Sequence, residues 1–117
     1  MGVADLQDVK RTTSLCEYPD DRIHYVVGPV KRTIPDTAPG EIALLRLDTE
    51  WYASTRRELV PLLPRLSNGG VLIIDDYGDW EGAREAVDEY LASIDTPVLL
   101  TRIDHTGRMA VIPAQIR

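Results

Sequence analysis

The sequence predicts a layered α/β fold in which strands alternate with helices. Two short segments, 42–48 and 71–75, are almost entirely apolar, and each ends in aspartate. Such continuous apolar character is typical of parallel strands that are buried on both faces of a sheet. A segment with helical spacing lies between them, and a strongly amphipathic helix follows the second. This alternation indicates an α/β domain with a mostly parallel sheet.

The size and charge of the chain argue against several classes of protein. Its 117 residues correspond to a single domain, residues 1–117, and the net charge is −6. An acidic chain does not suit general binding to nucleic acids or to anionic membranes, because both need an excess of Lys and Arg. No apolar run approaches the roughly 20 residues that cross a bilayer, and the first residues do not resemble a signal peptide. With a single cysteine, Cys16, we expect a cytoplasmic protein without an intrachain disulfide.

The N-terminal part of the chain predicts one helix and one strand. Residues 3–16 show a weak helical spacing of apolar side chains. Residues 23–27 are rich in β-branched and aromatic side chains, as in a strand, and Gly28 and Pro29 end this segment. A glycine at this place lets the backbone approach a flat ligand closely, or it simply forms the turn with Pro29.

One helical segment joins the two apolar strands. Apolar residues recur at three- or four-residue spacing over 51–66, where Pro61 and Pro64 are expected to kink or end the helix. The polar and glycine-rich residues 67–70 are expected to terminate this segment before the second strand begins. A strand–helix–strand unit of this kind is right-handed in nearly all cases.

The C-terminal part predicts a helix and an antiparallel pair of strands. Residues 80–94 carry apolar side chains on one face and acidic side chains on the other, with Asp79 as the expected N-cap. Residues 97–102 and 109–112 are predicted to be strands. The short connection through His105 indicates that they run antiparallel.

Three aspartates follow the two apolar strands. Asp48 ends the first strand, and Asp75 and Asp76 end the second. Ligands of open α/β sheets bind at this edge, and carboxylates that meet there repel one another unless a proton or a cation intervenes. Carboxylate oxygens suit Mg²⁺, Ca²⁺ or Mn²⁺. A single aspartate after a strand is often only a turn or cap residue, but three at one edge favour a functional site.

Two tyrosines lie close to these aspartates in the sequence. Tyr77 follows the acidic pair directly and is a candidate to line a substrate pocket. Tyr52 is a second candidate, although it also fits the buried stripe of its helix. The chain contains neither a G-x-G-x-x-G nor a Walker A sequence, so no phosphate-binding motif supports a nucleotide site.

Two longer segments carry the pattern of a known family. They are ALLRLDTEWYAST at 43–55 and LPRLSNGGVLIIDDYG at 63–78, with shorter likenesses at 19–28, 82–90 and 102–108. Together they resemble the macrocin O-methyltransferase (TylF-type) family. These class I enzymes depend on S-adenosylmethionine and methylate hydroxyl groups, often on the sugars of antibiotics.

The resemblance implies a Rossmann-like class I methyltransferase fold, a three-layer sandwich with an antiparallel C-terminal strand. It implies S-adenosylmethionine as cofactor, and Mg²⁺ held by Asp48, Asp75 and Asp76. The metal would position and acidify a hydroxyl of a small-molecule acceptor, and Asp48 would help to remove its proton. Gly28 and Pro29 match the region that approaches the adenine in the family.

The resemblance covers only about the C-terminal half of the family's domain. The first two strands, the glycine-rich cofactor loop and the acidic residue that holds the ribose precede the matched part. Without those two strands, segment 23–27 has no normal neighbour in the sheet. Three alternatives remain open: it pairs directly with 42–48, another chain takes the place of the two strands, or the strand edge stays exposed. Two hypotheses follow. One is a metal-assisted O-methyltransferase, and the other is an inactive truncated domain that forms a homodimer or needs a partner chain.

A third hypothesis is a phosphoacceptor receiver domain, which shares the length, the acidic charge and the parallel α/β pattern. In receivers the acidic pair ends the first strand and the single phosphoacceptor comes later, whereas here Asp48 precedes the pair. Arg102 also stands where a lysine is expected. This hypothesis rests on analogy of fold alone.

Overall fold

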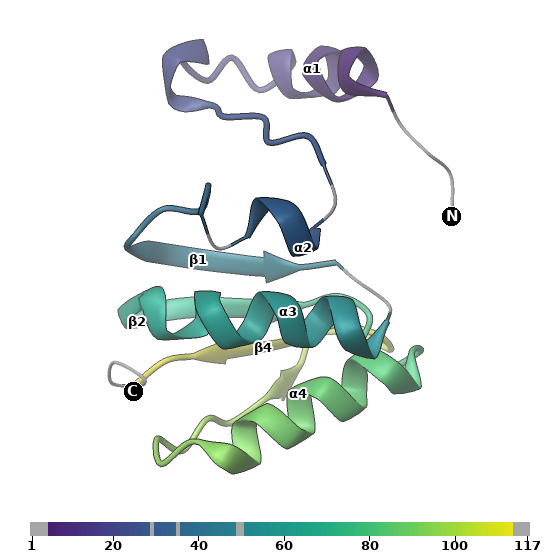
Figure 1. Ribbon diagram of the computed structural model, residues 1–117, viewed down its shortest axis with the longest axis vertical. Helices are drawn as coiled ribbons and strands as arrows, with labels where there is room; N and C mark the ends of the chain where they lie inside the picture. The colour runs from purple at the N-terminus through teal and green to yellow at the C-terminus, as the bar shows by residue number, and fades with distance from the viewer. Residues whose placement is uncertain (1–4, 29, 35, 49–50, 114–117) are drawn as a thin grey trace.

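The structure, a computed structural model, describes residues 5–28, 30–34, 36–48 and 51–113 (Figure 1). Its elements in chain order are α1 (Leu6–Ser14), the 3₁₀ turn η1 (Asp20–Arg22), α2 (Val30–Thr33), β1 (Ile42–Leu47), α3 (Tyr52–Leu62), the 3₁₀ turn η2 (Leu63–Arg65), β2 (Leu66–Ile74), α4 (Glu81–Ser93), β3 (Thr101–Arg102) and β4 (Arg108–Val111). The predicted α/β fold is confirmed.

The four described strands form one mixed sheet in the order β1-β2-β4-β3. β1 and β2 are parallel and are joined through α3, as the sequence predicts. β4 runs antiparallel to both β2 and β3, which confirms the expected C-terminal antiparallel pair. In the parallel pair Leu47 lies opposite Ile74, so both strands end at the same level.

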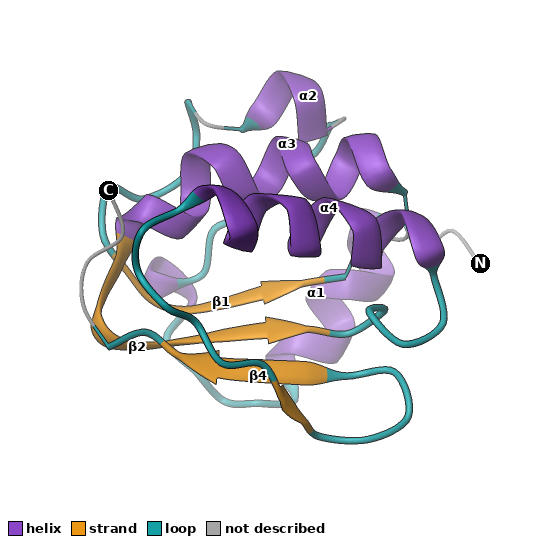
Figure 2. Cartoon of the chain, turned by 90° about the horizontal axis from the view of Figure 1, so that it is seen from below, coloured by secondary structure: helices purple, strands orange, loops and turns teal. Residues whose placement is uncertain are grey.

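α3 and α4 cover one face of the sheet (Figure 2). The strands contribute Leu45, Leu47, Leu72 and Ile74 to the core beneath these helices. The helical layer contributes Leu59 and Leu62 from α3, Leu63 from η2 and Val87 from α4. Burying an aliphatic side chain of this size stabilises the fold by about 1.5–3 kcal/mol. None of the helices among the described residues is long and apolar enough to span a membrane.

The other face of the sheet is open among the described residues. Side chains alternate between the two faces of a strand, so Leu44 lies on the opposite side from Leu45, and Leu44 is 57% exposed. Val111 in β4 is exposed to the same extent. The prediction that the apolar strands are buried on both faces is therefore wrong for the described part of the chain, because no described helix covers this second face.

The N-terminal segment lies beyond the edge formed by β1 (Figure 1). The predicted helix is present as the shorter α1, where Asp5 caps the first turn by accepting a hydrogen bond from the Asp8 N–H at 2.8 Å. None of its residues is buried. The predicted strand 23–27 is wrong: this segment has no strand structure, and Val27 is 73% exposed. Its residues favour a strand, but no described strand lies beside it.

Three element boundaries also differ from the prediction. β2 begins at Leu66, so the residues expected to end the preceding segment, 67–70, belong to the strand itself. The N-cap of α4 is Trp80 and not Asp79, whose Oδ1 lies 3.1 Å from His105 Nε2. Only the last two residues of 97–102 form a strand, β3.

The turn between β3 and β4 packs against the chain that follows β2. The Gly78 N–H donates a hydrogen bond to the Thr106 carbonyl at 2.9 Å. Within the turn, Asp104 Oδ1 accepts hydrogen bonds from the Gly107 N–H at 2.6 Å and from the Thr106 N–H at 3.1 Å. The Gly107 hydrogen bond is the main cause that lowers the pKa of Asp104 below its usual value. The C-terminal strands are thereby fixed beside the residues that follow Ile74.

We expect Gly78→Ala to lower the free energy of unfolding by about 1–3 kcal/mol. A Cβ atom on Gly78 would lie 2.0 Å from the His105 carbonyl oxygen, which belongs to the backbone and cannot move aside cheaply. Gly40→Ala is the matched control, because a Cβ there meets no atom within 4 Å. Urea unfolding of the two variants measures the effect, and equal midpoints would show that the contact at Gly78 is not close.

Candidate functional site at the carboxyl ends of β1 and β2

The parallel pairing of β1 and β2 brings two of the predicted aspartates together. Asp48 and Asp75 each follow one of the paired residues Leu47 and Ile74. The Asp75 N–H donates a hydrogen bond to the Leu47 carbonyl at 3.1 Å, which extends the pairing by one residue. The side chain of Asp48 is 59% exposed and that of Asp75 is 32% exposed. The predicted acidic edge is therefore present and open to solvent.

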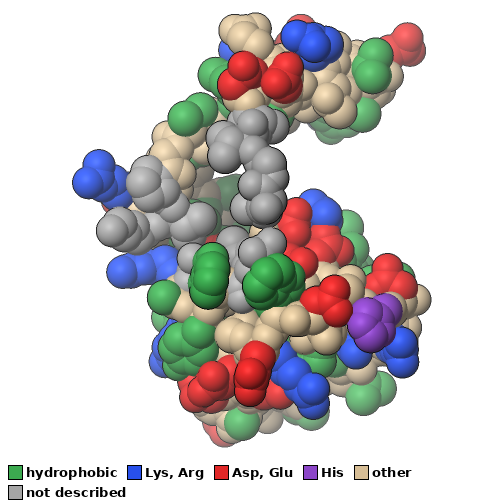
Figure 3. Space-filling view, turned by 90° about the vertical axis from the view of Figure 1, so that its right-hand side faces the viewer, with side chains coloured by type: hydrophobic (Ala, Val, Ile, Leu, Met, Phe, Trp, Pro, Cys, Tyr) green, Lys and Arg blue, Asp and Glu red, His purple; other side chains and the backbone are tan. Residues whose placement is uncertain are grey.

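Figure 3 looks toward the carboxyl ends of these strands and shows several acidic side chains on this side of the molecule. Asp76 turns the chain away from the edge, and its carbonyl accepts a hydrogen bond from the Trp80 N–H at 3.0 Å. The side-chain atom Oδ2 of Asp76 is buried. The residue as a whole is half-buried, as Asp75 is.

Arg46 pairs with both exposed aspartates and was not predicted from the sequence. Its guanidinium forms an ion pair with Asp75, and its Nη2 lies 3.6 Å from Asp48 Oδ2. A cation at this place relieves the repulsion between the two carboxylates. One sequence signal could have identified this residue, because Arg46 is the single charged residue within β1.

The described residues hold no group of three or more His, Cys, Asp or Glu side chains placed to bind a metal ion. The oxygen donors at the edge match the chemistry that Mg²⁺ prefers. Their arrangement does not fit the ion, because two of the three aspartates pair with an arginine instead.

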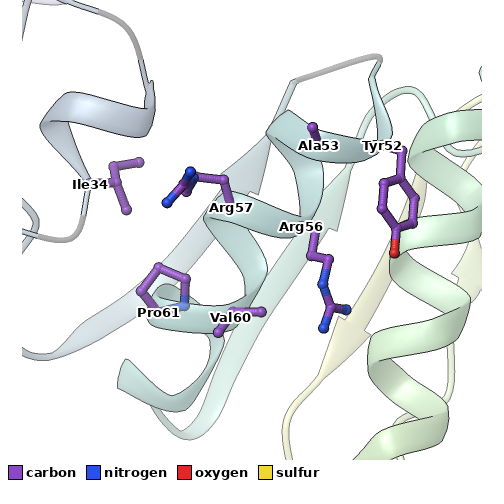
Figure 4. A pocket seen from close by; sticks show the side chains of 7 residues that line it. All are labelled: Ile34, Tyr52, Ala53, Arg56, Arg57, Val60 and Pro61. Atoms are coloured by element: carbon purple, nitrogen blue, oxygen red, sulfur yellow. The ribbon is translucent and has the colours of Figure 1, made fainter.

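Tyr52 connects α3 to α4. Its hydroxyl donates a hydrogen bond to Glu89 Oε2 at 2.5 Å, and this bond is the main cause that raises the pKa of Tyr52 above its usual value. The phenol therefore stays protonated at neutral pH. The ring points toward α4 (Figure 4), and its predicted contact with a substrate stays a prediction.

Tyr77 is also held by α4. Its hydroxyl donates a hydrogen bond to Asp88 at 2.7 Å, and burial raises the pKa of Tyr77 above its usual value. The guanidinium carbons of Arg84 and Arg108 lie 5.5 Å and 5.1 Å from the centre of its ring, in the range of cation–π contacts. These contacts are sufficient to hold Tyr77 in place without a ligand. Its contact with a substrate stays a prediction.

Gly28 has the backbone geometry that requires glycine. Its φ is +144°, a value that side-chain-bearing residues rarely adopt. A Cβ at this place would lie 3.1 Å from the side chain of Thr33. This geometry suits both interpretations of Gly28, so the turn and the role at the cofactor both stay predictions. Pro29, its predicted companion, lies outside the described residues.

Two tryptophans lie at the starts of the helices that follow the acidic edge. Trp51 and Trp80 are the N-caps of α3 and α4, and their ring centres are 6.3 Å apart. They are 68% and 40% exposed. An exposed aromatic pair of this kind offers an apolar surface to a ligand or to another chain.

An open hollow of about 580 Å³ lies along the outer side of α3 (Figure 4). It is lined by Ile34, Tyr52, Ala53, Arg56, Arg57, Val60 and Pro61. None of the predicted aspartates lines it. The hollow and the acidic edge are therefore separate features of the molecule.

Comparison with known proteins identifies the relatives of this chain. Residues 3–110 match the family described as Macrocin-O-methyltransferase (TylF). The mycinamicin III 3''-O-methyltransferase of Micromonospora griseorubida is 44% identical over 103 residues, which are 87% of this chain and 40% of the relative. The 8-demethyl-8-(2,3-dimethoxy-alpha-L-rhamnosyl)-tetracenomycin-C 4'-O-methyltransferase of Streptomyces olivaceus is 40% identical over 88 residues, 75% of this chain and 33% of the relative.

The solved structure of the O-methyltransferase NovP matches with a TM-score of 0.84 at 33% sequence identity. The match covers 91% of this chain and 44% of that one, which confirms the class I methyltransferase type of fold. The chain spans less than half the length of these relatives. Since the family match extends over most of its residues, the chain belongs to the macrocin O-methyltransferase (TylF) family.

Proposed function

We propose that the chain is part of an S-adenosylmethionine-dependent O-methyltransferase that acts on a hydroxyl of a sugar or another secondary metabolite. The observation that carries this proposal is the pair Asp48 and Asp75, in register at the carboxyl edge of β1 and β2, in a chain of this family. The relatives named above are all O-methyltransferases, which supports a hydroxyl as the acceptor.

In this proposal Asp48 is the general base. Its carboxylate is more than half exposed at the ligand-binding edge of the sheet, so an acceptor hydroxyl can approach it directly. Asp48 accepts the hydroxyl proton while the acceptor oxygen gains a methyl group. When bound, S-adenosylmethionine supplies that methyl group as an electrophile on sulfur. Gly28 would let the backbone approach the flat ring of the cofactor, because it has no side chain.

We also propose that Mg²⁺ assists the reaction and takes its ligands from Asp48, Asp75 and Asp76. Three carboxylates supply the hard oxygen donors that this ion needs. The edge must rearrange to receive it, because Arg46 pairs with two of these carboxylates in the structure.

Calorimetric titration with S-adenosylhomocysteine tests the cofactor part of the proposal. We expect binding in the micromolar range, which corresponds to about −8 kcal/mol. We expect Asp48→Asn to keep this binding and to lose at least about 100-fold in methyl transfer to a hydroxylated sugar acceptor. Asp95→Asn is the matched control, since Asp95 is exposed after the end of α4. No binding by the folded chain would contradict a self-sufficient methyltransferase.

The open sheet face favours a second candidate function, that of a domain completed by a second copy of the chain. β1 is an edge strand of the described sheet, and its residue Leu44 is exposed. The segment before α2 also exposes apolar side chains, namely those of Tyr25, Val26 and Val27. Apolar surface and a free strand edge together are the features through which chains associate.

For this second candidate we expect a dimer in analytical ultracentrifugation, and a monomer for Leu44→Glu. The stability of the Leu44→Glu monomer should stay close to that of the parent chain, because this side chain is already 57% exposed. Leu99→Glu is the control, because Leu99 is 82% exposed and lies outside the strands. A monomeric parent chain whose β1 amides resist hydrogen exchange would exclude this candidate.

A further inference from the structure

Trp51 and Trp80 occupy matching positions in the two connections that leave the acidic edge. Trp51 comes three residues after Asp48 and precedes α3, and Trp80 comes four residues after Asp76 and precedes α4. Three residues of chain span at most about 11 Å, so the backbone at Trp51 stays near Asp48. The Trp80 N–H is bonded to the Asp76 carbonyl. The two rings therefore start from the edge on which the proposed chemistry depends.

Neither tryptophan has the chemistry that usually starts a helix. Ser, Thr, Asp and Asn are preferred at the N-cap, because their side-chain oxygen accepts a hydrogen bond from a backbone N–H. In the described structure neither Trp51 nor Trp80 makes a side-chain hydrogen bond of this kind. Their backbone carbonyls still accept helical hydrogen bonds from the N–H groups of Thr55 and Arg84. The helices thus begin without help from the two rings.

The hydrophobic core does not use the rings either. Trp51 is 68% exposed and Trp80 is 40% exposed, whereas the buried cluster consists of aliphatic side chains and Tyr90. The two rings are tilted by 49° with centres 6.3 Å apart, as in favourable aromatic pairs, and this contact still leaves much of both exposed. Figure 3 shows hydrophobic side chains among acidic ones on this side of the molecule. Exposed aromatic surface without a structural use is typical of a ligand contact.

Aromatic rings beside carboxylates are complementary to a sugar. A pyranose ring carries C–H bonds across its faces and hydroxyl groups around its edge. The face of an indole is negative and attracts such C–H bonds, and stacking also removes apolar surface from water. The ionised carboxylate of Asp48 can only accept hydrogen bonds, and a hydroxyl is a donor that suits it. This combination favours a sugar over a wholly apolar ligand.

We propose that Trp51 and Trp80 form an aromatic platform on which the sugar of the acceptor lies, with a hydroxyl group directed toward Asp48. This inference rests on the proposed function and narrows its acceptor to a sugar. Trp51 supplies the larger share of the platform, because more of its surface is exposed. Stacking fixes which edge of the sugar faces Asp48, so the two tryptophans select the hydroxyl as well as the ring.

Intrinsic fluorescence tests the platform directly, because Trp51 and Trp80 are the only two tryptophans in the sequence. Light that excites tryptophan but not tyrosine therefore reports on this pair alone. The probe is methyl α-L-rhamnopyranoside, a deoxy sugar in which a methyl group enlarges the apolar surface. We expect a saturable change in the emission of the full chain, with a dissociation constant in the millimolar range. Glycerol, a polyol without a ring, should cause no saturable change.

Substitutions of the more exposed ring separate stacking from bulk. Trp51→Leu keeps an apolar side chain without a π face, and we expect about fivefold weaker sugar binding, followed by the emission of Trp80. Trp51→Phe keeps an aromatic face and should stay within about twofold of the parent chain. Leu99→Ala is the matched control with parent-like affinity, since Leu99 is 82% exposed and lies outside the strands. If Trp51→Leu does not fold, Trp80→Leu makes the same test through the emission of Trp51.

The outcomes separate the platform from the proposed function. Emission that the sugar leaves unchanged, or that glycerol changes equally, would overturn the platform. Parent-like affinity of a folded Trp51→Leu variant would also overturn it, and so would emission that responds to protein concentration but not to sugar, because a second copy would then cover the rings. If S-adenosylhomocysteine binds in any of these cases, the methyltransferase proposal stands. Sugar binding without S-adenosylhomocysteine binding would support the platform and contradict a self-sufficient methyltransferase.

Discussion

The parallel pairing of β1 with β2 is the constraint on which the rest of the structure depends. It sets Leu47 opposite Ile74, and the two aspartates that follow these residues therefore meet at one edge. A shift of one residue in this register would turn one of them to the opposite face. The register is held by Leu45, Leu47 and Ile74, which must all face the helical layer. The packing of the core thus determines which charged side chains meet at the carboxyl edge of the sheet.

Two like charges brought together in this way need compensation, and the chain supplies it from the sheet itself. Arg46 reaches the carboxylates from the open face of the sheet. On the side of the helices, two tyrosines hold the chain in place. Tyr52 and Tyr77 both donate hydrogen bonds to acidic residues of α4, which fixes the chain after each strand to the same helix. The acidic face of α4 therefore has a structural use beyond its exposure to solvent.

The elements that could be predicted are those whose pattern is complete within a few residues. The spacing of apolar residues predicts α4, and the apolar runs predict β1 and β2. The strand expected at 23–27 fails because β-branched residues favour an extended chain but cannot provide a neighbouring strand. The ion pairs of Arg46 were missed for a related reason, since they depend on a register between two strands and not on local sequence. The acidic edge was predictable because the strand–helix–strand connection implies it.

The open face of the sheet and the acidic edge are adjacent, so what happens at one affects the other. Leu44 and Arg46 lie on the same side of β1, so any segment that covers the apolar face also approaches the guanidinium. Such a segment would bury part of a cation that is now half exposed, and burial of a charge is costly unless its partners stay in place. Covering the face therefore either strengthens the hold of Arg46 on Asp75 or drives the side chain away from it. The charge and polarity of the side chains laid against this face would decide which of the two occurs.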